Sequence, residues 1–544
     1  MNFRNKKKLD NLIPYPVHCI LKSDSFTIKE DTLIHYHDEV KDSAAFLQEL
    51  IEKPSGFKLK LNSIQTLEEE DNENIISLEI DKNNSEVPAE GYILEISQER
   101  IKLVGKDKPG VFYGIQTIRQ LLPIGIESSI EIKDRDWYIP CVQITDYPRF
   151  PWRGFMLDEV RHFFGQKFVK RIIDLMGLFK LNRLHWHLSD DEGWRIDSKK
   201  YPKLSAVGSR RILSKEYRET PNLEDIQFYG GYYCQEELRE IIDFAKKNYI
   251  EIIPEIEMPG HATASLVAYP EFSCEKPPKI VPKVRARNRH SFCPGKKGTF
   301  DFLYGVLKET MDIFQSQWIH IGGDELPKHR WENCSDCASY RKKNNIADLD
   351  EMQVEFASNI IRFLNKNKKK VIGWFDFSTD KLLDRNIDKN EVIFQFWHGS
   401  EDKVVDFIRK GGYAIISNHS YTYMNYAYYK LPIKKAYNFD PIPNQLESKY
   451  HPQILGIESP VWTEDIPDFQ SLDFHVFPRL CAYAETAWTP AEEKDYDDFI
   501  KRLKCILERL DILKVYYAPL FEAQNSIKAR FIHKKLRKSC QSYL

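Results

Sequence analysis

The chain has 544 residues, which is more than one ordinary hydrophobic core accommodates, so we expect two or three domains or one large barrel with attachments. Its formal net charge is −2, which gives no electrostatic reason to expect nucleic acid or a membrane surface as a partner. Because no run of eighteen apolar residues occurs, we predict no segment that crosses a bilayer. Aromatic residues make up 13% of the chain, an enrichment that favours a surface for sugars or other rings.

The first residues, MNFRNKKKLDNLIPYPVHCIL, open with basic side chains, but Asp10, Asn11 and two prolines interrupt the apolar run that a signal peptide needs. We therefore predict no signal peptide and a cytoplasmic location for the sequence as given. The mature form of a periplasmic or secreted protein would look the same, so that alternative stays open.

The ten cysteines form no dense framework of the kind that small secreted domains need. Cys334 and Cys337 make a lone CxxC, and without a second pair or a histidine at zinc spacing we interpret them as reduced thiols. Cys274 and Cys293 flank a loop rich in proline and arginine, and they could pair if the protein is exported. We predict no metal and no cofactor.

Residues 12–145 mix short β-rich runs, such as FTIKEDTLIHY and EGYILEIS, with one helical stretch at GVFYGIQTIRQLLP. This mixture predicts a separate α+β domain. Pro148 and Pro151, in TDYPRFPWRGF, mark the passage to a different pattern.

Over residues 146–490, short apolar runs alternate with longer segments of 3.6-residue period. Eight of these runs are candidate strands: RGFMLD at 153, NRLHWHL at 182, YIEIIPEI at 249, WIHIGG at 318, KVIGWF at 370, EVIFQFW at 391, GYAIISN at 412 and ILGIESPVW at 454. The alternation predicts an α/β fold, a (β/α)8 TIM barrel. Residues 491–544 form a C-terminal helical segment, which we expect to pack on the outside of the barrel.

Polar and aromatic side chains gather at the predicted strand ends, where the active site of such a barrel forms. They are Arg153, Asp158, Glu159, His185, His187, Asp190, Asp191, Glu255, Glu257, His261, Asp324, Glu325, Trp374, Trp397, Tyr423, Trp462 and Glu464. Loop decoration alone would place one or two such residues there, so this concentration predicts a catalytic mouth.

The stretch WIHIGGDE places Asp324 and Glu325 side by side after a strand. Two like charges this close do not both ionise cheaply, so one of the acids keeps its proton to higher pH and can act as a general acid. Glycoside hydrolysis usually needs two acids facing each other, ~5 to 9.5 Å apart, and adjacent residues are poorly placed for that. The nucleophile would then come from the substrate itself.

At these residues the chain resembles the β-N-acetylhexosaminidases of glycoside hydrolase family 20. The matching pieces are RGFMLDEVRHFF from Arg153, NRLHWHLSDDEGWR from Asn182, PEIEMPGHATA from Pro254, HIGGDE from His320, IGW at Ile372, Trp397, YMN at Tyr423 and WTE at Trp462. Residues 12–145 also resemble the N-terminal domain of that family. The resemblance implies an exo-acting enzyme that removes terminal GlcNAc or GalNAc by a retaining, substrate-assisted mechanism, with no cofactor.

The resemblance also implies roles for the catalytic residues. Glu325 matches the general acid/base. Asp324 matches the residue that orients the 2-acetamido group, whose carbonyl oxygen attacks the anomeric carbon to give an oxazolinium intermediate, and Tyr423 matches the phenol that donates to that carbonyl. His261, with Asp190 or Asp191, matches the relay that supports the acid/base.

Six further positions are implied as substrate contacts, which makes a glycan or oligosaccharide with a terminal N-acetylhexosamine the expected partner. Arg153 and Glu464 match ligands of the sugar hydroxyls, Trp374, Trp397 and Trp462 match the walls around the sugar, and Asn425 lies among the distal contacts. Asn425 departs from the family, which commonly has an aspartate there, so we hypothesise altered tolerance for an anionic substituent at sugar position 6. The sequence leaves the natural glycan, the gluco or galacto preference and the oligomeric state open.

Two other classes of protein stay open. His185 and His187 make an HxH at a strand end, which could bind a divalent metal as in amidohydrolase-like barrels, although packed barrel histidines are commoner. A sugar-binding protein without catalysis would also use tryptophan walls, but it would need no pair of acids such as Asp324 and Glu325.

Overall fold

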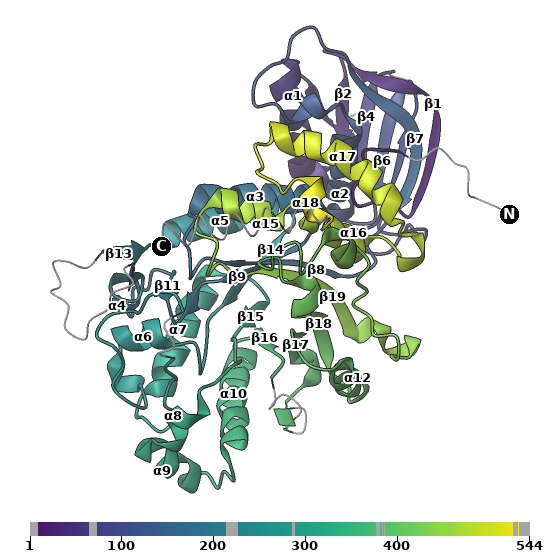
Figure 1. Cartoon of the computed structure of the whole chain (residues 1–544). Coiled ribbons are helices and arrows are strands. Elements are labelled where there is room, and N and C mark those ends of the chain that lie inside the picture. The colour runs from purple at the N-terminus through teal and green to yellow at the C-terminus, as the bar shows by residue number, and fades with distance from the viewer. Residues whose placement is uncertain are drawn as a thin grey trace.

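The computed structural model describes residues 9–64, 73–213, 227–285, 289–376, 381–382, 385, 387–525 and 531. An N-terminal sheet domain lies against one end of a closed barrel, and a C-terminal helix runs along both (Figure 1). Within these residues, no helix is long and apolar enough to cross a membrane.

The N-terminal domain is built on a seven-stranded mixed sheet in the order β1-β7-β5-β6-β4-β2-β3. Its strands are β1 (His18–Ile28), β2 (Leu33–Tyr36), β3 (Lys60–Ser63), β4 (Ile75–Ile80), β5 (Tyr92–Ile96), β6 (Arg100–Gly105) and β7 (Trp137–Asp146). Helices α1 (Lys41–Ser55) and α2 (Lys108–Leu121) cover the sheet. Alternate residues of β6, such as Ile101 and Leu103, are buried, which is the period-2 pattern that a sheet with one packed face requires.

The predicted TIM barrel is confirmed, and each of its eight strands overlaps one of the predicted runs. In order around the barrel they are β14 (Glu251–Glu255), β15 (Trp318–His320), β16 (Lys370–Trp374), β17 (Val392–Phe396), β18 (Tyr413–Ile416), β19 (Ile454–Val461), β8 (Trp152–Asp158) and β9 (Arg183–His187), all parallel. Every residue of β8 and β17 is buried, because helices cover the outer face and side chains fill the interior.

The crossover helices show why the 3.6-residue period was readable in the sequence. They include α3 (Gln166–Leu178), α5 (Gln235–Lys247), α7 (Thr299–Ile313), α10 (Leu349–Lys366), α12 (Glu401–Arg409) and α16 (Arg479–Trp488). In α5, Leu238, Ile241, Ile242 and Ala245 form one buried stripe, and Cys234 begins the helix with a capping box.

Short helices and strands lie within the loops that connect the longer elements. They are β10 (Ser189–Asp190), β11 (Gly193–Trp194), β12 (Arg210–Ile212), β13 (Phe228–Gly230), α4 (Lys203–Ala206), α6 (Thr263–Ala268), α8 (Lys328–Glu332), α9 (Ser335–Lys343), α13 (His419–Thr422), α14 (Ile433–Tyr437), α15 (Phe469–Val476) and α18 (Leu520–Ala523), with 3-10 turns between them. Most of those between residues 189 and 343 lie on the loops around the barrel mouth (Figure 1).

The C-terminal helix α17 (Tyr496–Ile512) does not simply cover the outside of the barrel, as expected, but joins the barrel to the N-terminal domain. Buried Arg502 forms a bidentate ion pair with Glu485 of α16, both bonds being 2.7 Å long, and donates to the carbonyl of Leu12. Buried Arg509 pairs with Glu127 of the N-terminal domain at 2.6 Å. One helix therefore neutralises a buried acid on each side of the domain boundary.

Candidate active site

The turn after β15 explains the sequence WIHIGGDE. Gly322 and Gly323 have φ angles of 64° and 97°, in the left-handed region that glycine adopts most easily. A Cβ atom on Gly322 would collide with the carboxylate of Glu257, so no larger residue fits there. His320 holds the turn, because its Nδ1 accepts the N–H of Gly322 at 3.1 Å, and burial lowers the pKa of His320 and favours the neutral ring that can accept.

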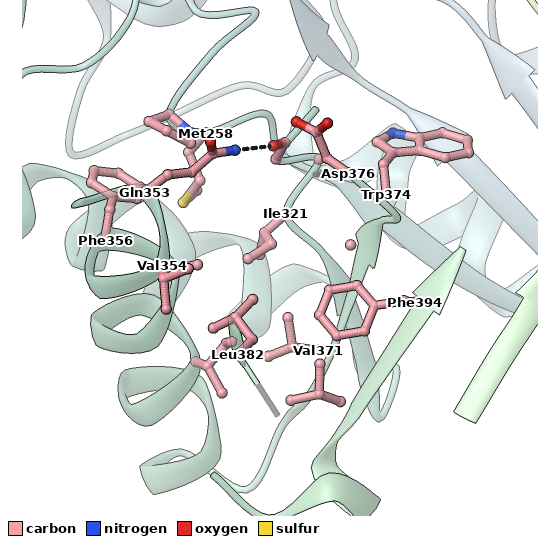
Figure 2. A pocket seen from close by; sticks show the side chains of 17 residues that line it. Met258, Ile321, Gln353, Val354, Phe356, Val371, Trp374, Asp376, Leu382 and Phe394 are labelled. Atoms are coloured by element: carbon pink, nitrogen blue, oxygen red, sulfur yellow. Dashed lines mark hydrogen bonds between the residues drawn. The ribbon is translucent and has the colours of Figure 1, made fainter. Parts of the chain in front are cut away.

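The same turn is held from outside by α10, where Gln353 donates its Nε2 to the carbonyl of Gly323 at 2.9 Å (Figure 2). Behind the turn lies a small cavity of about 40 Å³, lined mainly by apolar side chains such as Ile321, Val354 and Phe394. Neither Asp324 nor Glu325 lines this cavity. It is therefore a gap in packing behind the turn that carries the acid pair.

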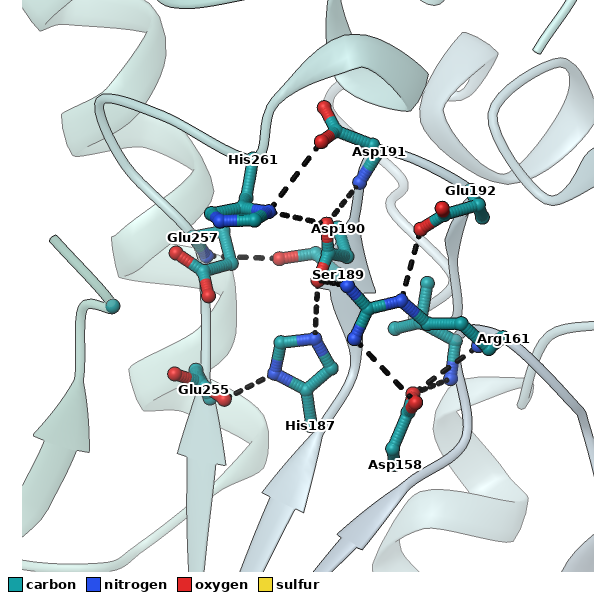
Figure 3. A network of polar contacts seen from close by, with 12 residues as sticks. Asp158, Arg161, His187, Ser189, Asp190, Asp191, Glu192, Glu255, Glu257 and His261 are labelled. Atoms are coloured by element: carbon teal, nitrogen blue, oxygen red, sulfur yellow. Dashed lines mark hydrogen bonds and ion pairs between the residues drawn. The ribbon is translucent and has the colours of Figure 1, made fainter. Parts of the chain in front are cut away.

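His261 lies between the acid pair and the two predicted relay acids, and Figure 3 shows its contacts with Asp190 and Asp191. Its Nδ1 lies 2.9 Å from Asp190 Oδ1 and 3.4 Å from Asp191 Oδ2, while its Nε2 lies 3.7 Å from Glu325 Oε2 and 3.9 Å from Asp324 Oδ2. Burial alone would lower the pKa of His261, but Asp190 outweighs it and raises the pKa well above the usual value. The structure thus brings these five predicted residues together around one imidazolium.

Asp190 is the centre of the buried charge at the mouth. Besides His261, it accepts from Arg161 Nη2 at 2.6 Å and from His187 Nε2 at 2.9 Å. Burial would raise its pKa, but Arg161 and His261 hold that pKa well below the usual value. Asp191 is held differently, because its Oδ1 accepts from the backbone N–H and the hydroxyl of Thr263. Asp190 is therefore the closer of the two relay candidates to His261.

The pKa values of the two acids are shifted in the opposite directions from those that their expected roles require. Burial raises the pKa of Asp324 to about 7, and its Oδ1 is buried without a hydrogen-bond partner. The His261 imidazolium and Arg289 hold the pKa of Glu325 at about 2. In this state Asp324 is the acid that keeps a proton, whereas the general acid role expected of Glu325 requires Glu325 to be protonated.

Arg289, one of the two cations that lower the pKa of Glu325, was not predicted from the sequence. Its Nη1 contacts Glu325 Oε2, and its Nε lies 3.9 Å from Asp191 Oδ2. Arg289 and Glu325 are both close to half exposed, so this ion pair sits at the solvent side of the mouth, where a ligand can displace it. In the sequence Arg289 is one of several arginines in the segment KVRARNRH. This segment has no strand or helix pattern from which its position could be predicted.

Three predicted aromatic residues form one wall of the mouth. The rings of Trp374 and Trp462 lie 5.9 Å apart, and those of Tyr423 and Trp462 lie 6.3 Å apart. Trp374 is fixed from below, because its Nε1 donates to Glu255 Oε1 at 2.7 Å. Trp397 stands in the next loop, with its ring 3.9 Å from that of His398.

Two further predicted contacts lie on loops at the same end of the barrel. Asn425 follows Tyr423 after β18, and its Oδ1 is buried without a partner, as is the Nε1 of Trp397. Glu464 follows β19, where burial raises its pKa while Arg161 opposes the shift. Because these atoms have no partner among the described residues and lie at the barrel mouth, they are available to polar groups of a ligand.

The prediction that Arg153 binds the sugar is wrong. Arg153 lies near the start of β8, at the barrel end that faces the N-terminal domain. Its buried guanidinium donates to Glu90 at 2.6 Å, to the hydroxyl of Tyr113 at 3.0 Å and to the carbonyl of Lys180 at 2.8 Å. The second arginine of RGFMLDEVRHFF, Arg161, lies beyond the other end of the strand and contacts Asp190 and the ring of Trp462. Of the two arginines in this motif, Arg161 is therefore the one at the mouth.

The histidines of the HxH motif are packed inside the barrel, as the commoner interpretation held. His185 lies 2.7 Å from Glu458 and 3.1 Å from Glu255, and His187 contacts Glu255 and Asp190. Burial would lower their pKa values, but the acids outweigh it and raise them to about 9 and about 10. Each ring nitrogen of these two histidines therefore faces an acid of the barrel interior or mouth.

Adjacent acids beside indole rings at the mouth of a barrel form the kind of site that glycoside hydrolases use, including those whose substrate supplies the nucleophile. The catalytic domain of glycosyl hydrolase family 20 matches residues 150–491, and domain 2 of the same family matches residues 10–147. The chain belongs to glycosyl hydrolase family 20.

Several relatives are similar along most of the chain. The beta-hexosaminidase of Porphyromonas gingivalis is 34% identical over 94% of this chain, which spans 65% of that protein's length. A crystal structure of an exo beta-N-acetylglucosaminidase from Vibrio harveyi superimposes with a TM-score of 0.81 at 30% identity, covering 96% of this chain and 80% of the other. The beta-N-acetylhexosaminidase of Bacteroides fragilis gives 0.77 at 29% identity, with 95% and 99% covered.

Proposed function

We propose that this glycoside hydrolase removes terminal N-acetylhexosamine from the non-reducing end of a glycan, with retention of configuration and with the substrate's own acetamide as the nucleophile. Among its relatives, the Vibrio harveyi enzyme was crystallised with N-acetylglucosamine, and a mutant beta-hexosaminidase of Streptomyces plicatus was crystallised with the product GlcNAc. Both are similar to this chain over at least 94% of its length.

One observation carries the proposal: Asp324 and Glu325 come from a single turn, with His261 directly behind both. Two acids on one turn lie on the same side of the bound sugar ring, so they are poorly placed to act across the scissile bond as acid and enzymic nucleophile. An internal amide nucleophile removes that need. When well oriented, it is worth an effective molarity of ~10^5 to 10^8 M, or roughly 7 to 11 kcal/mol of barrier.

The residues of the mouth divide the work. Tyr423 donates its hydroxyl to the acetamide carbonyl and, with Trp374 and Trp462, encloses the acetamide. Asp324 orients the amide N–H and, once ionised, stabilises the positive charge that develops on the oxazolinium nitrogen. Glu325 gives its proton to the departing oxygen and then, as the general base, takes a proton from the water that opens the oxazolinium ring.

The relay fits the same sequence of steps. The substrate must displace Arg289 from Glu325 before Glu325 can hold a proton, since the ion pair favours the carboxylate. His261, held by Asp190, then faces both acids and balances the negative charge that remains after the proton has left. The free enzyme is thus a resting state, and sugar binding converts it to the reactive one.

The test uses nitrophenyl glycosides with and without the acetamide. We expect rapid release of nitrophenol from the β-N-acetylglucosaminide, and at least ~10^5-fold slower release from the matching β-glucoside, because the internal nucleophile is missing. A thiazoline analogue of the oxazolinium should inhibit more tightly than N-acetylglucosamine binds. Equal rates on the two glycosides would overturn the proposal.

A further inference from the structure

Four cysteines that are far apart in the sequence converge outside the active site. Cys274 and Cys293 lie in the long segment between α6 and α7, and Cys334 and Cys337 lie at the start of α9. Their sulfur atoms all lie within 4.8 Å of one another, and Cys274 is half-buried while the other three are buried. We call this group the four-cysteine cluster. The CxxC is therefore not alone, and its expected isolation is corrected by the fold.

The sulfur positions fit a tetrahedral metal better than they fit disulfides. The distances are 3.6 Å between Cys274 and Cys337, 3.4 Å between Cys293 and Cys337, and 3.7 Å between Cys293 and Cys334. A zinc ion with Zn–S bonds of about 2.3 Å holds its four sulfurs roughly 3.8 Å apart. A disulfide needs about 2.05 Å, and all four cysteines are free thiols in this structure.

From this geometry we propose that the four-cysteine cluster binds one zinc ion as a structural site. Four thiolates with no oxygen or nitrogen donor are the ligand set that selects zinc or iron among the common metals. A closed set of four protein ligands leaves no position for water or substrate, so the ion holds structure and does not take part in hydrolysis. The site is independent of the proposed glycosidase mechanism, since none of its ligands belongs to the acid pair or the relay.

The cluster joins the two loops that carry the catalytic residues. Cys293 lies four residues after Arg289, and Cys334 lies nine residues after Glu325. Other contacts cross the same seam, including the bond of 2.9 Å from Trp331 Nε1 to the carbonyl of Phe292. A zinc ion there would fix the Arg289 loop against the Glu325 loop from behind, where neither touches the sugar.

Zinc content tests the proposal without relying on activity. The full chain is purified without an affinity tag and dialysed against metal-free buffer. We expect it to retain about one zinc per chain, measured by inductively coupled plasma mass spectrometry. A mercurial reagent should release that zinc, which a metallochromic dye measures directly in the wild-type protein. The double variant Cys334→Ser, Cys337→Ser should carry less than about 0.1 zinc per chain.

The matched control is the double variant Cys141→Ser, Cys505→Ser, which removes two cysteines outside the cluster and should keep its zinc. Loss of zinc is also expected to lower the unfolding temperature, because metal binding contributes to folding. Three results would overturn the proposal: iron in place of zinc, four reactive thiols with no metal, or an intact mass that matches two disulfides. Because glycoside cleavage is measured separately, failure here would leave the proposed function standing.

Discussion

The two ends of the barrel strand β8 carry buried charge for opposite purposes. At the end facing the N-terminal domain, the nitrogens of Arg153 find Glu90, Tyr113 and backbone carbonyls. At the mouth, the network around Arg161 and Asp190 leads to Asp324, whose buried Oδ1 has no hydrogen-bond partner among the residues that the structure describes. Charge that the protein satisfies by itself holds two domains together, whereas charge left partly unsatisfied is available to a ligand.

The largest expected effect is at the mouth. Asp324→Asn and Glu325→Gln should each reduce nitrophenol release by ~10^2 to 10^4-fold, because each removes a group that acts in the transition state. Both substitutions keep the side-chain volume, so the unfolding temperature should stay close to that of the wild type. A variant with full activity would contradict the role of that residue.

The next effect concerns the opposite end of β8. Arg153→Ala leaves Glu90 without its cation, although Asn182 still donates to that carboxylate at 3.3 Å. Breaking a fully buried ion pair costs about 3 to 5 kcal/mol, and we expect a loss of about 2 to 3 kcal/mol here because Glu90 is a quarter exposed. Urea unfolding measures this loss, and the KM for the nitrophenyl substrate should not change.

The contrasting variant is Arg161→Ala, which removes a cation from beside Asp190 and Trp462. It should reduce kcat/KM as well as stability. If Arg153→Ala raised KM and left the unfolding curve unchanged, the claim that Arg153 stabilises the domain contact while Arg161 serves the site would be contradicted.

A third prediction concerns the pH profile. In the free enzyme the His261 imidazolium and Arg289 hold the pKa of Glu325 at about 2. Glu325 must be protonated and Asp324, whose pKa burial raises to about 7, must be ionised, so the order of the two pKa values is reversed and the lower one, that of Glu325, sets the acid limb of kcat/KM. Arg289→Ala should raise the pKa and move the limb to higher pH by roughly 1 unit.

Arg285→Ala is the control for that shift, because Arg285 pairs with exposed Asp465 and not with the acid pair. Profiles of the control and of the wild type should superimpose. An Arg289→Ala profile that moves to lower pH, or does not move, would exclude Arg289 as the group that keeps Glu325 ionised.

The smallest effect is expected at Asn425. Asn425→Asp would restore the acid that is common in the family and repel an anionic substituent on the sugar. The ratio of rates on 6-sulfated and plain aryl substrates should fall roughly fivefold, which corresponds to about 1 kcal/mol, the repulsion of two charges ~4 Å apart in water. Asn438→Asp, at an exposed position, is the matched control. An unchanged ratio would remove the idea that Asn425 affects position 6.

The barrel was predictable because its strands are buried on both faces and separated by helices with one apolar stripe. Such patterns depend only on neighbours within a few residues, so they can be recognised from the sequence alone. Asp190, Asp191 and the acid pair were found for the same reason, since each follows directly on a strand. The N-terminal domain was also readable from its alternating strands. The bridging position of α17 was not, because no local pattern says which surface an amphipathic helix covers.

The errors arose where contacts depend on distant segments. Arg153 was assigned to the mouth although a residue at the start of a parallel strand lies at the far end of the barrel, ~17 Å from the residue at which β8 ends. That information was available in the sequence. The four-cysteine cluster and Arg289 were not recoverable in this way, because their loops carry no periodic pattern and their partners lie tens of residues away.

The helix α17 has a practical consequence for anyone who would shorten or recombine this protein. A version ending at residue 490 would take Arg502 away from the buried carboxylate of Glu485 and Arg509 away from Glu127, which would keep only Arg119. A barrel moved into another protein therefore needs helix α17 as well, or a substitution that makes Glu485 neutral.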